Sequence, residues 1–126
     1  MWGRRAAEGS AELTELTERA HQIHIALDPI ARDMRTTTVL STDAGRVVAA
    51  GGRDLNPAQR AVLEAGEVAA RLPGAHAEVT AITHAQQAGV APRFIAVTRA
   101  ICPNCAAAIE ASGGTLTSPT TAVWPR

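Results

Sequence analysis

Lysine and tyrosine are absent from this chain of 126 residues, and aromatic side chains make up only 2 % of it. Because apolar residues still reach 46 %, the core has to be built mainly from Ala, Val, Ile and Leu. The 12 basic side chains, all arginine, balance 12 acidic ones, so the formal net charge is zero. This neutrality excludes a strongly cationic nucleic-acid-binding surface, and any grip on nucleic acid must be local.

Long hydrophobic runs are also missing. No stretch approaches the length that crosses a membrane, and the N-terminus lacks a signal-peptide pattern. We therefore expect a soluble protein without a membrane partner. The length fits one domain, which we place at residues 10–126. Residues 1–9 are expected to form a flexible lead-in, of the kind that a cut inside a longer polypeptide leaves.

Hydrophobic periodicity and turn residues predict an α/β fold with a single mixed sheet of four to five strands and helices packed on it. Helices are expected at residues 11–27, 56–72, 75–88 and 102–111, and strands at 36–42, 46–50, 93–98 and within 115–124. The segment after Gly114 is too short for a helical crossover. The last strands should therefore be antiparallel.

Cysteine is scarce, and its spacing carries the first chemical signal. Cys102 and Cys105 begin the helix at 102–111, and one such pair does not make a disulfide framework. His76 opens the helix at 75–88, on the other side of the buried strand. In a parallel arrangement both helix N-termini emerge at one sheet edge, which brings the three side chains together. Two thiolates and one imidazole leave one tetrahedral position of a zinc ion free for water, as in catalytic sites.

Glu78 is placed to act as a base beside this metal. On a regular helix, positions 76 and 78 diverge by about 200°. Both face the metal only if His76 lies at an irregular first turn, which Pro73 and Gly74 just upstream permit. A zinc complex with two thiolates has no net charge, so its bound water benefits from a base.

These residues carry a family resemblance. The motif His76-Ala77-Glu78, followed by Cys102-Pro103-Asn104-Cys105, resembles the signature of the cytidine deaminase superfamily. Residues 76–114 are also similar to deaminase domains at the C-termini of bacterial polymorphic toxins. One departure concerns Ile101, which stands where the superfamily usually has proline, and it bears on the family subdivision.

The resemblance implies that His76, Cys102 and Cys105 hold Zn²⁺ and that Glu78 shuttles protons. It further implies deamination of cytosine to uracil in nucleic acid, with single-stranded DNA as the expected substrate. A toxin domain of this kind is expected to be delivered into the cytoplasm of a target cell, to be monomeric, and to have a cognate immunity protein. Adenine as the target base stays open.

Two alternatives remain beside this interpretation. The first is an enzyme that deaminates free cytidine or a related nucleoside. The second, of a different class, is a non-catalytic zinc module or a thiol-redox module, because a Cys-x-x-Cys pair with an internal proline also occurs at the helix start of thioredoxin-like proteins.

Four residues are candidates for substrate contact, three of them with a structural alternative. Asn56 either contacts the substrate or caps a helix, and Trp124 either stacks on a base or fills the core. Arg99 either meets a phosphate or is solvated. The fourth candidate is Ala77, the middle residue of the motif His76-Ala77-Glu78.

Overall fold

The computed structural model describes residues 2–125, with side chains from Gly9 onward. It contains the helices α1 (Trp2–His24), α2 (Pro29–Met34), α3 (Pro57–Ala61), α4 (Ala77–Ala88) and α5 (Pro103–Ala111). Its strands are β1 (Thr37–Thr42), β2 (Gly45–Ala50), β3 (Glu67–Ala69), β4 (Pro92–Val97), β5 (Thr115–Ser118) and β6 (Thr121–Val123). They form one six-stranded mixed sheet in the order β3-β2-β1-β4-β6-β5.

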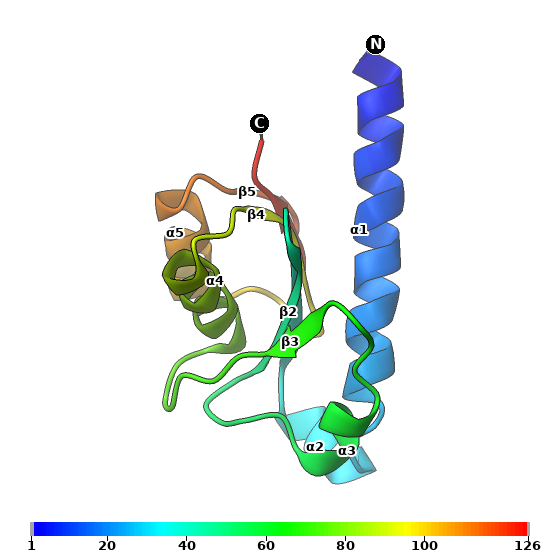
Figure 1. Ribbon diagram of the computed structural model, residues 1–126, viewed down its shortest axis with the longest axis vertical. Coiled ribbons are helices and arrows are strands. Elements are labelled where there is room, and N and C mark those ends of the chain that lie inside the picture. The colour runs from blue at the N-terminus through cyan, green and yellow to red at the C-terminus, as the bar shows by residue number, and fades with distance from the viewer. Residues whose placement is uncertain (1, 126) are drawn as a thin grey trace.

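The sheet is the middle of three layers. The long α1 covers one face, and α4 and α5 cover the other (Figure 1). Successive residues of a strand point to opposite faces, so each central strand contributes to both cores. Val39 packs on the α1 side and its neighbour Leu40 on the α4 side, and both are fully buried. Burying each such side chain stabilises the fold by roughly 1.5–3 kcal/mol.

Strand directions decide where the helices begin. β1 is antiparallel to both β2 and β4, and β3 is parallel to β2. It follows that β3 and β4 run in the same direction, and the chain leaves both at the same edge of the sheet. From that edge it enters α4 and α5, respectively. The last two strands return antiparallel, β6 on β4 and β5 on β6, as the sequence predicts.

The prediction of a helix at residues 56–72 is wrong over most of that range. It ends at Ala61, and residues 67–69 form β3, which raises the strand number to six. Gly66 has a φ of +84°, which a helix does not accommodate. Beyond it, Glu67 pairs in register with Arg46 of β2. Strand pairing and contacts to α1 therefore outweigh the helical propensity of an Ala-rich segment.

The first helix also differs from expectation at its start. The sequence predicts a start near residue 11, where Ser10 could cap the helix, but α1 begins at Trp2 and Ser10 lies inside it. That residues 1–9 form a flexible lead-in stays a prediction. None of the helices within residues 2–125 is long and apolar enough to cross a membrane.

Candidate active site

Backbone hydrogen bonds join four segments in two pairs at the side of the sheet where β3 and β4 end. The backbone N–H of Gly52, after β2, donates to the carbonyl of Ala75 at 2.7 Å. The N–H of Thr98, after β4, donates to the carbonyl of Thr37 at 3.0 Å. The start of α4 is thereby tied to the end of β2, and the end of β4 to the start of β1, and the site is built on these hydrogen-bonded segments.

His76 and Cys102 occupy equivalent positions at the starts of their helices. Each is the N-cap residue, with extended backbone (φ −64°, ψ 155° for His76; φ −72°, ψ 161° for Cys102). Pro103 follows Cys102 at the first helical position, where its missing N–H is not needed. Because His76 precedes the first turn, its side chain need not diverge from that of Glu78, which is the arrangement that the motif requires.

The imidazole and the two sulfur atoms form a compact cluster. His76 Nδ1 lies 3.4 Å from Cys102 Sγ and 3.2 Å from Cys105 Sγ. The potential ligand atoms of the three residues all lie within 4.8 Å of one another. His76 is exposed, Cys102 is half-buried and Cys105 is only 1 % exposed, so the cluster lies at the surface end of the α4–α5 core.

The two thiols differ in their surroundings. The backbone N–H of Cys105 and its thiol both hydrogen-bond to Cys102 Sγ, which lowers the pKa of Cys102. Burial raises the pKa of Cys105, and the neighbouring Cys102 and Glu78 raise it further. A divalent cation between the sulfur atoms would lower the pKa of both thiols, adding to the effect on Cys102 and opposing the burial of Cys105, and would hold both ionised.

The donor set fits zinc. Two sulfur atoms and one imidazole nitrogen are ligands that Zn²⁺ prefers, and three protein ligands leave a fourth position for water. The spacing of the atoms is that of a group able to contact one ion. The residues His76, Cys102 and Cys105 would therefore hold the zinc.

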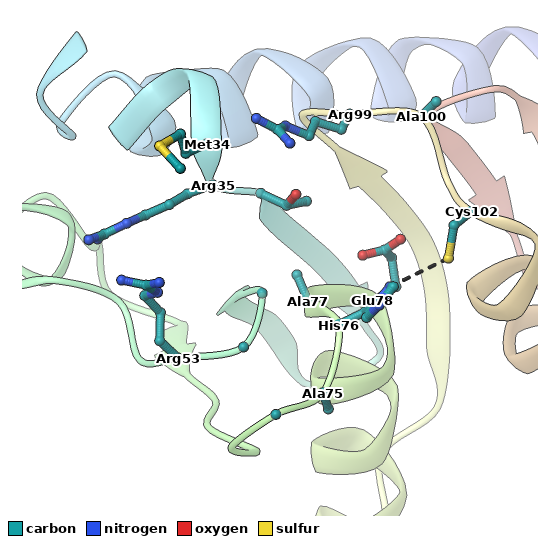
Figure 2. A pocket seen from close by; sticks show the side chains of 14 residues that line it. Met34, Arg35, Arg53, Ala75, His76, Ala77, Glu78, Arg99, Ala100 and Cys102 are labelled. Atoms are coloured by element: carbon teal, nitrogen blue, oxygen red, sulfur yellow. Dashed lines mark hydrogen bonds between the residues drawn. The ribbon is translucent and has the colours of Figure 1, made fainter. Parts of the chain in front are cut away.

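Glu78 reaches the same place from the first turn of α4. Its side chain is 4 % exposed, and its carboxylate projects into a cavity of about 320 Å³ that also borders His76 and Cys102 (Figure 2). A carboxylate held beside a group of metal-ligating side chains, in a pocket open to solvent, is suited to move protons between water and a bound molecule.

The defining sequence pattern of the cytidine and deoxycytidylate deaminase zinc-binding region matches residues 15–117. The chain belongs to this deaminase family. No curated protein and no solved structure gives a significant match to the chain. The cytidine deaminase fold and the zinc cofactor are thereby confirmed, as is the class of reaction, a zinc-dependent hydrolytic deamination. When bound in such a site, zinc lowers the pKa of a coordinated water toward neutrality.

Two predicted substrate contacts of this deaminase lie away from the pocket. The carboxamide of Asn56 accepts the backbone N–H of Gln59 at 2.8 Å, and the Gln59 side chain accepts the N–H of Asn56 in return. Trp124 is 8 % exposed, and its indole N–H donates to Ser112 Oγ at 3.0 Å. In the structure, therefore, Asn56 caps a helix and Trp124 lies in the core, which are the structural alternatives to substrate contact.

The other two candidates line the pocket. Ala77 is the first residue of α4 and is 1 % exposed, while Arg99 is exposed on the loop between β4 and α5. Because helix N-termini leave backbone N–H groups without helical partners, Ala77 can offer a donor to a bound molecule. Their roles as substrate contacts stay predictions.

Two further arginines line the cavity, Arg35 and Arg53, and neither is among the residues that the sequence predicts for the site. The signal lies in the β1–β2 hairpin, which the sequence does predict. Its register pairs Thr37 with Ala50, so the residues just before β1 and just after β2 meet at one end. That end is the edge on which the site is built.

Proposed function

We propose that the protein deaminates cytosine to uracil in single-stranded DNA and acts as a bacterial toxin domain. The observation that carries the proposal is the carboxylate of Glu78, buried beside the His76, Cys102 and Cys105 cluster at the floor of a pocket open to solvent. A base in a single strand can enter such a pocket without first being extruded from a duplex.

The residues have distinct roles in the proposed reaction. His76, Cys102 and Cys105 hold the metal. Water adds to C4 while Glu78 takes one of its protons and delivers it to the ring nitrogen N3. Glu78 then passes the remaining proton of that oxygen to the amino group, so that the C4–N bond breaks and ammonia leaves. The backbone N–H of Ala77, in the first turn of α4, orients the base by donating to its carbonyl oxygen.

One feature of the pocket supports a polymer as the substrate. The walls of the pocket include exposed residues such as Gly52, Gly74 and Ala100, so the site is not enclosed as a small-molecule cavity is. The net charge of zero suits a free nucleoside equally well, so a strand has to be held by a local group of cations. As a toxin domain, the protein is proposed to act as a monomer in the target-cell cytoplasm, and an immunity protein covering the pocket edge is proposed as its partner.

The proposal is tested by incubating the zinc-loaded protein with single-stranded DNA, duplex DNA, RNA, free cytidine and an adenine-containing strand. Mass spectrometry reads uracil or inosine in each. We expect uracil in single-stranded DNA at the highest rate. Uracil formed only from free cytidine, or inosine as the main product, contradicts the proposed substrate. No product in any mixture, from protein that holds one zinc per chain, favours the non-catalytic module.

A further inference from the structure

Three arginines stand at the mouth of the pocket, one beside the end of each of three adjacent strands. Arg53 follows β2, Arg35 precedes β1 and Arg99 follows β4, and all three line the cavity that Glu78 reaches. Adjacent strands lie about 4.8 Å apart, so three neighbouring strand ends span roughly 10 Å. Sheet topology thus places three arginines from separate segments around one cavity.

Arg35 and Arg53 lie opposite the metal end of the pocket (Figure 2). Figure 2 shows Arg35 and Arg53 on the side away from Cys102, with Arg99 above. A base that reaches Glu78 and the metal cluster therefore leaves its sugar and phosphates on the side of the arginines.

These guanidinium groups are available for a ligand. Within residues 9–125, all ion pairs are made by other arginines, namely Arg19, Arg46, Arg60 and Arg71. Asp54 is the nearest acidic residue in sequence to Arg53, and its carboxylate faces Arg71 at 3.2 Å and Arg60 at 3.7 Å. Positive charge is therefore concentrated at the pocket mouth of a chain whose net charge is zero.

We propose that Arg35, Arg53 and Arg99 bind the phosphates that flank the target nucleotide, so that the enzyme selects a polynucleotide over a free nucleoside. This inference rests on the proposed deaminase function and names the groups that choose its substrate. Guanidinium groups match phosphate oxygens with paired N–H donors. A mononucleotide brings one phosphate to the site, whereas a strand brings one on each side of the base, which suits three arginines on three separate segments.

The first test measures binding without turnover. A fluorescent single strand with one cytosine is titrated with zinc-loaded Glu78→Gln protein at several salt concentrations. Each phosphate contact contributes about 0.7 to the slope of log affinity against log salt for single strands. We expect Arg35→Gln, Arg53→Gln and Arg99→Gln, each made in this background, to lower the slope by about that amount. Arg93→Gln is the matched control, because Arg93 lies at the opposite end of β4.

The second test removes the charge from the substrate. Replacing the two linkages that flank the cytosine by neutral methylphosphonates should lower the turnover of the wild-type enzyme by about tenfold or more. On this neutral strand the three arginine substitutions should cost much less than on the charged strand, because the interaction that they remove is already gone. Free cytidine and its 5′-monophosphate are measured beside both strands, and both should be poorer substrates than the charged strand.

The outcomes separate this inference from the function on which it rests. If the three arginine variants behave like Arg93→Gln while the wild-type enzyme still forms uracil, the phosphate role is overturned and the proposed deaminase function is unaffected. A monophosphate or nucleoside turned over as well as the strand overturns the selection of a polymer. Arginine-dependent strand binding without uracil in any substrate keeps the phosphate site and overturns the proposed reaction. Thermal unfolding of each variant checks that it is folded.

Discussion

The two cysteines of the candidate zinc site differ in burial and in the pKa of their thiols. Cys102 caps α5 from a half-buried position, where backbone N–H groups stabilise its thiolate. Cys105 is 1 % exposed and packs inside the helix, where burial raises the pKa of its thiol. The zinc ion is therefore expected to matter for the ionisation of Cys105 and, through it, for the junction between α4 and α5.

Replacing either cysteine is expected to abolish stable zinc binding. For Cys102→Ser and Cys105→Ser we expect a loss of affinity beyond the roughly 10–100-fold that removal of an outer-shell partner costs. Zinc per chain, measured by plasma mass spectrometry after dialysis, gives the result. Asn104→Ala is the control within the same motif, because Asn104 is exposed. One zinc per chain retained by both serine variants contradicts the proposed ligand set.

Trp124 is a residue whose role the structure assigns to the core. Its indole N–H donates to Ser112 Oγ, and its ring lies against Gly114. We expect Trp124→Phe to lower the free energy of unfolding by about 1 kcal/mol through loss of this hydrogen bond. The affinity for a single strand should stay unchanged, as measured by anisotropy.

The matched partner for this prediction is Ser112→Ala. The double variant of Ser112 and Trp124 should lose less stability than the two single variants together, because both remove the same hydrogen bond. A Trp124→Phe protein of unchanged stability that binds the strand more weakly assigns the ring to the substrate instead.

At the scale of elements, β3 is attached to α1 by a buried ion pair. Arg19 donates from Nε to Glu67 Oε2 at 2.8 Å and from Nη2 to Glu67 Oε1 at 2.7 Å. Burial raises the pKa of Glu67. The hydrogen bonds from Arg19 and the Glu64 backbone, together with the charges of Arg19 and Arg46, lower it by more than burial raises it. The net pKa of Glu67 lies below its ordinary value.

Glu67→Gln is expected to destabilise the protein in a pH-dependent way. The cost should be up to about 3 kcal/mol at neutral pH, the low end for breaking a buried pair, because Arg19 keeps the carbonyl of Val62 as a partner. Since the folded-state pKa is depressed, the carboxylate stabilises the fold fully above the unfolded pKa of about 4.3. This stabilisation is lost as pH falls through the folded-state value.

Denaturant unfolding across a pH series measures the difference between wild type and Glu67→Gln. It should be largest at neutral pH and shrink below about pH 4.3. The control is Glu64→Gln, because the side chain of Glu64 is 69 % exposed, and it should change stability by no more than about 0.5 kcal/mol. A difference that grows toward acid pH contradicts the assigned role of Glu67.

The elements that carry local signals could be predicted from the sequence. The β1–β2 hairpin and the helices α4 and α5 follow from β-branched runs, turn glycines and caps. β3 could not be predicted in this way, because its three residues are held by pairing with β2 and by Arg19 from α1. Local propensity does not contain either interaction.

The candidate site divides along the same line. His76, Glu78, Cys102 and Cys105 could be found because zinc chemistry requires particular residue types at short, fixed spacing. Arg35 and Arg53 lie within the pocket wall only because of the sheet register, and nothing in their immediate sequence marks them.

At the scale of the whole molecule, helices cover both faces of the sheet, and the functional residues lie at the ends of its strands. The metal cluster, Glu78 and the three arginines all lie at the edge where β3 and β4 end. They come from loops and helix starts between Arg35 and Cys105, so that most of the chain is needed to build the site. The apolar layers fix its base, while the residues that contact a substrate lie on connections between elements.

The dependence of uracil formation on Glu78 tests the proposed reaction most directly. Wild-type protein and Glu78→Gln protein, each shown to hold one zinc per chain, are incubated with cytosine-containing single-stranded DNA, and uracil is quantified by mass spectrometry. We expect the wild-type enzyme to form uracil and the variant to be slower by about 10²–10⁴-fold, the usual contribution of a general acid–base group. Equal rates of uracil formation by the two zinc-loaded proteins, or none by the wild type, would contradict it.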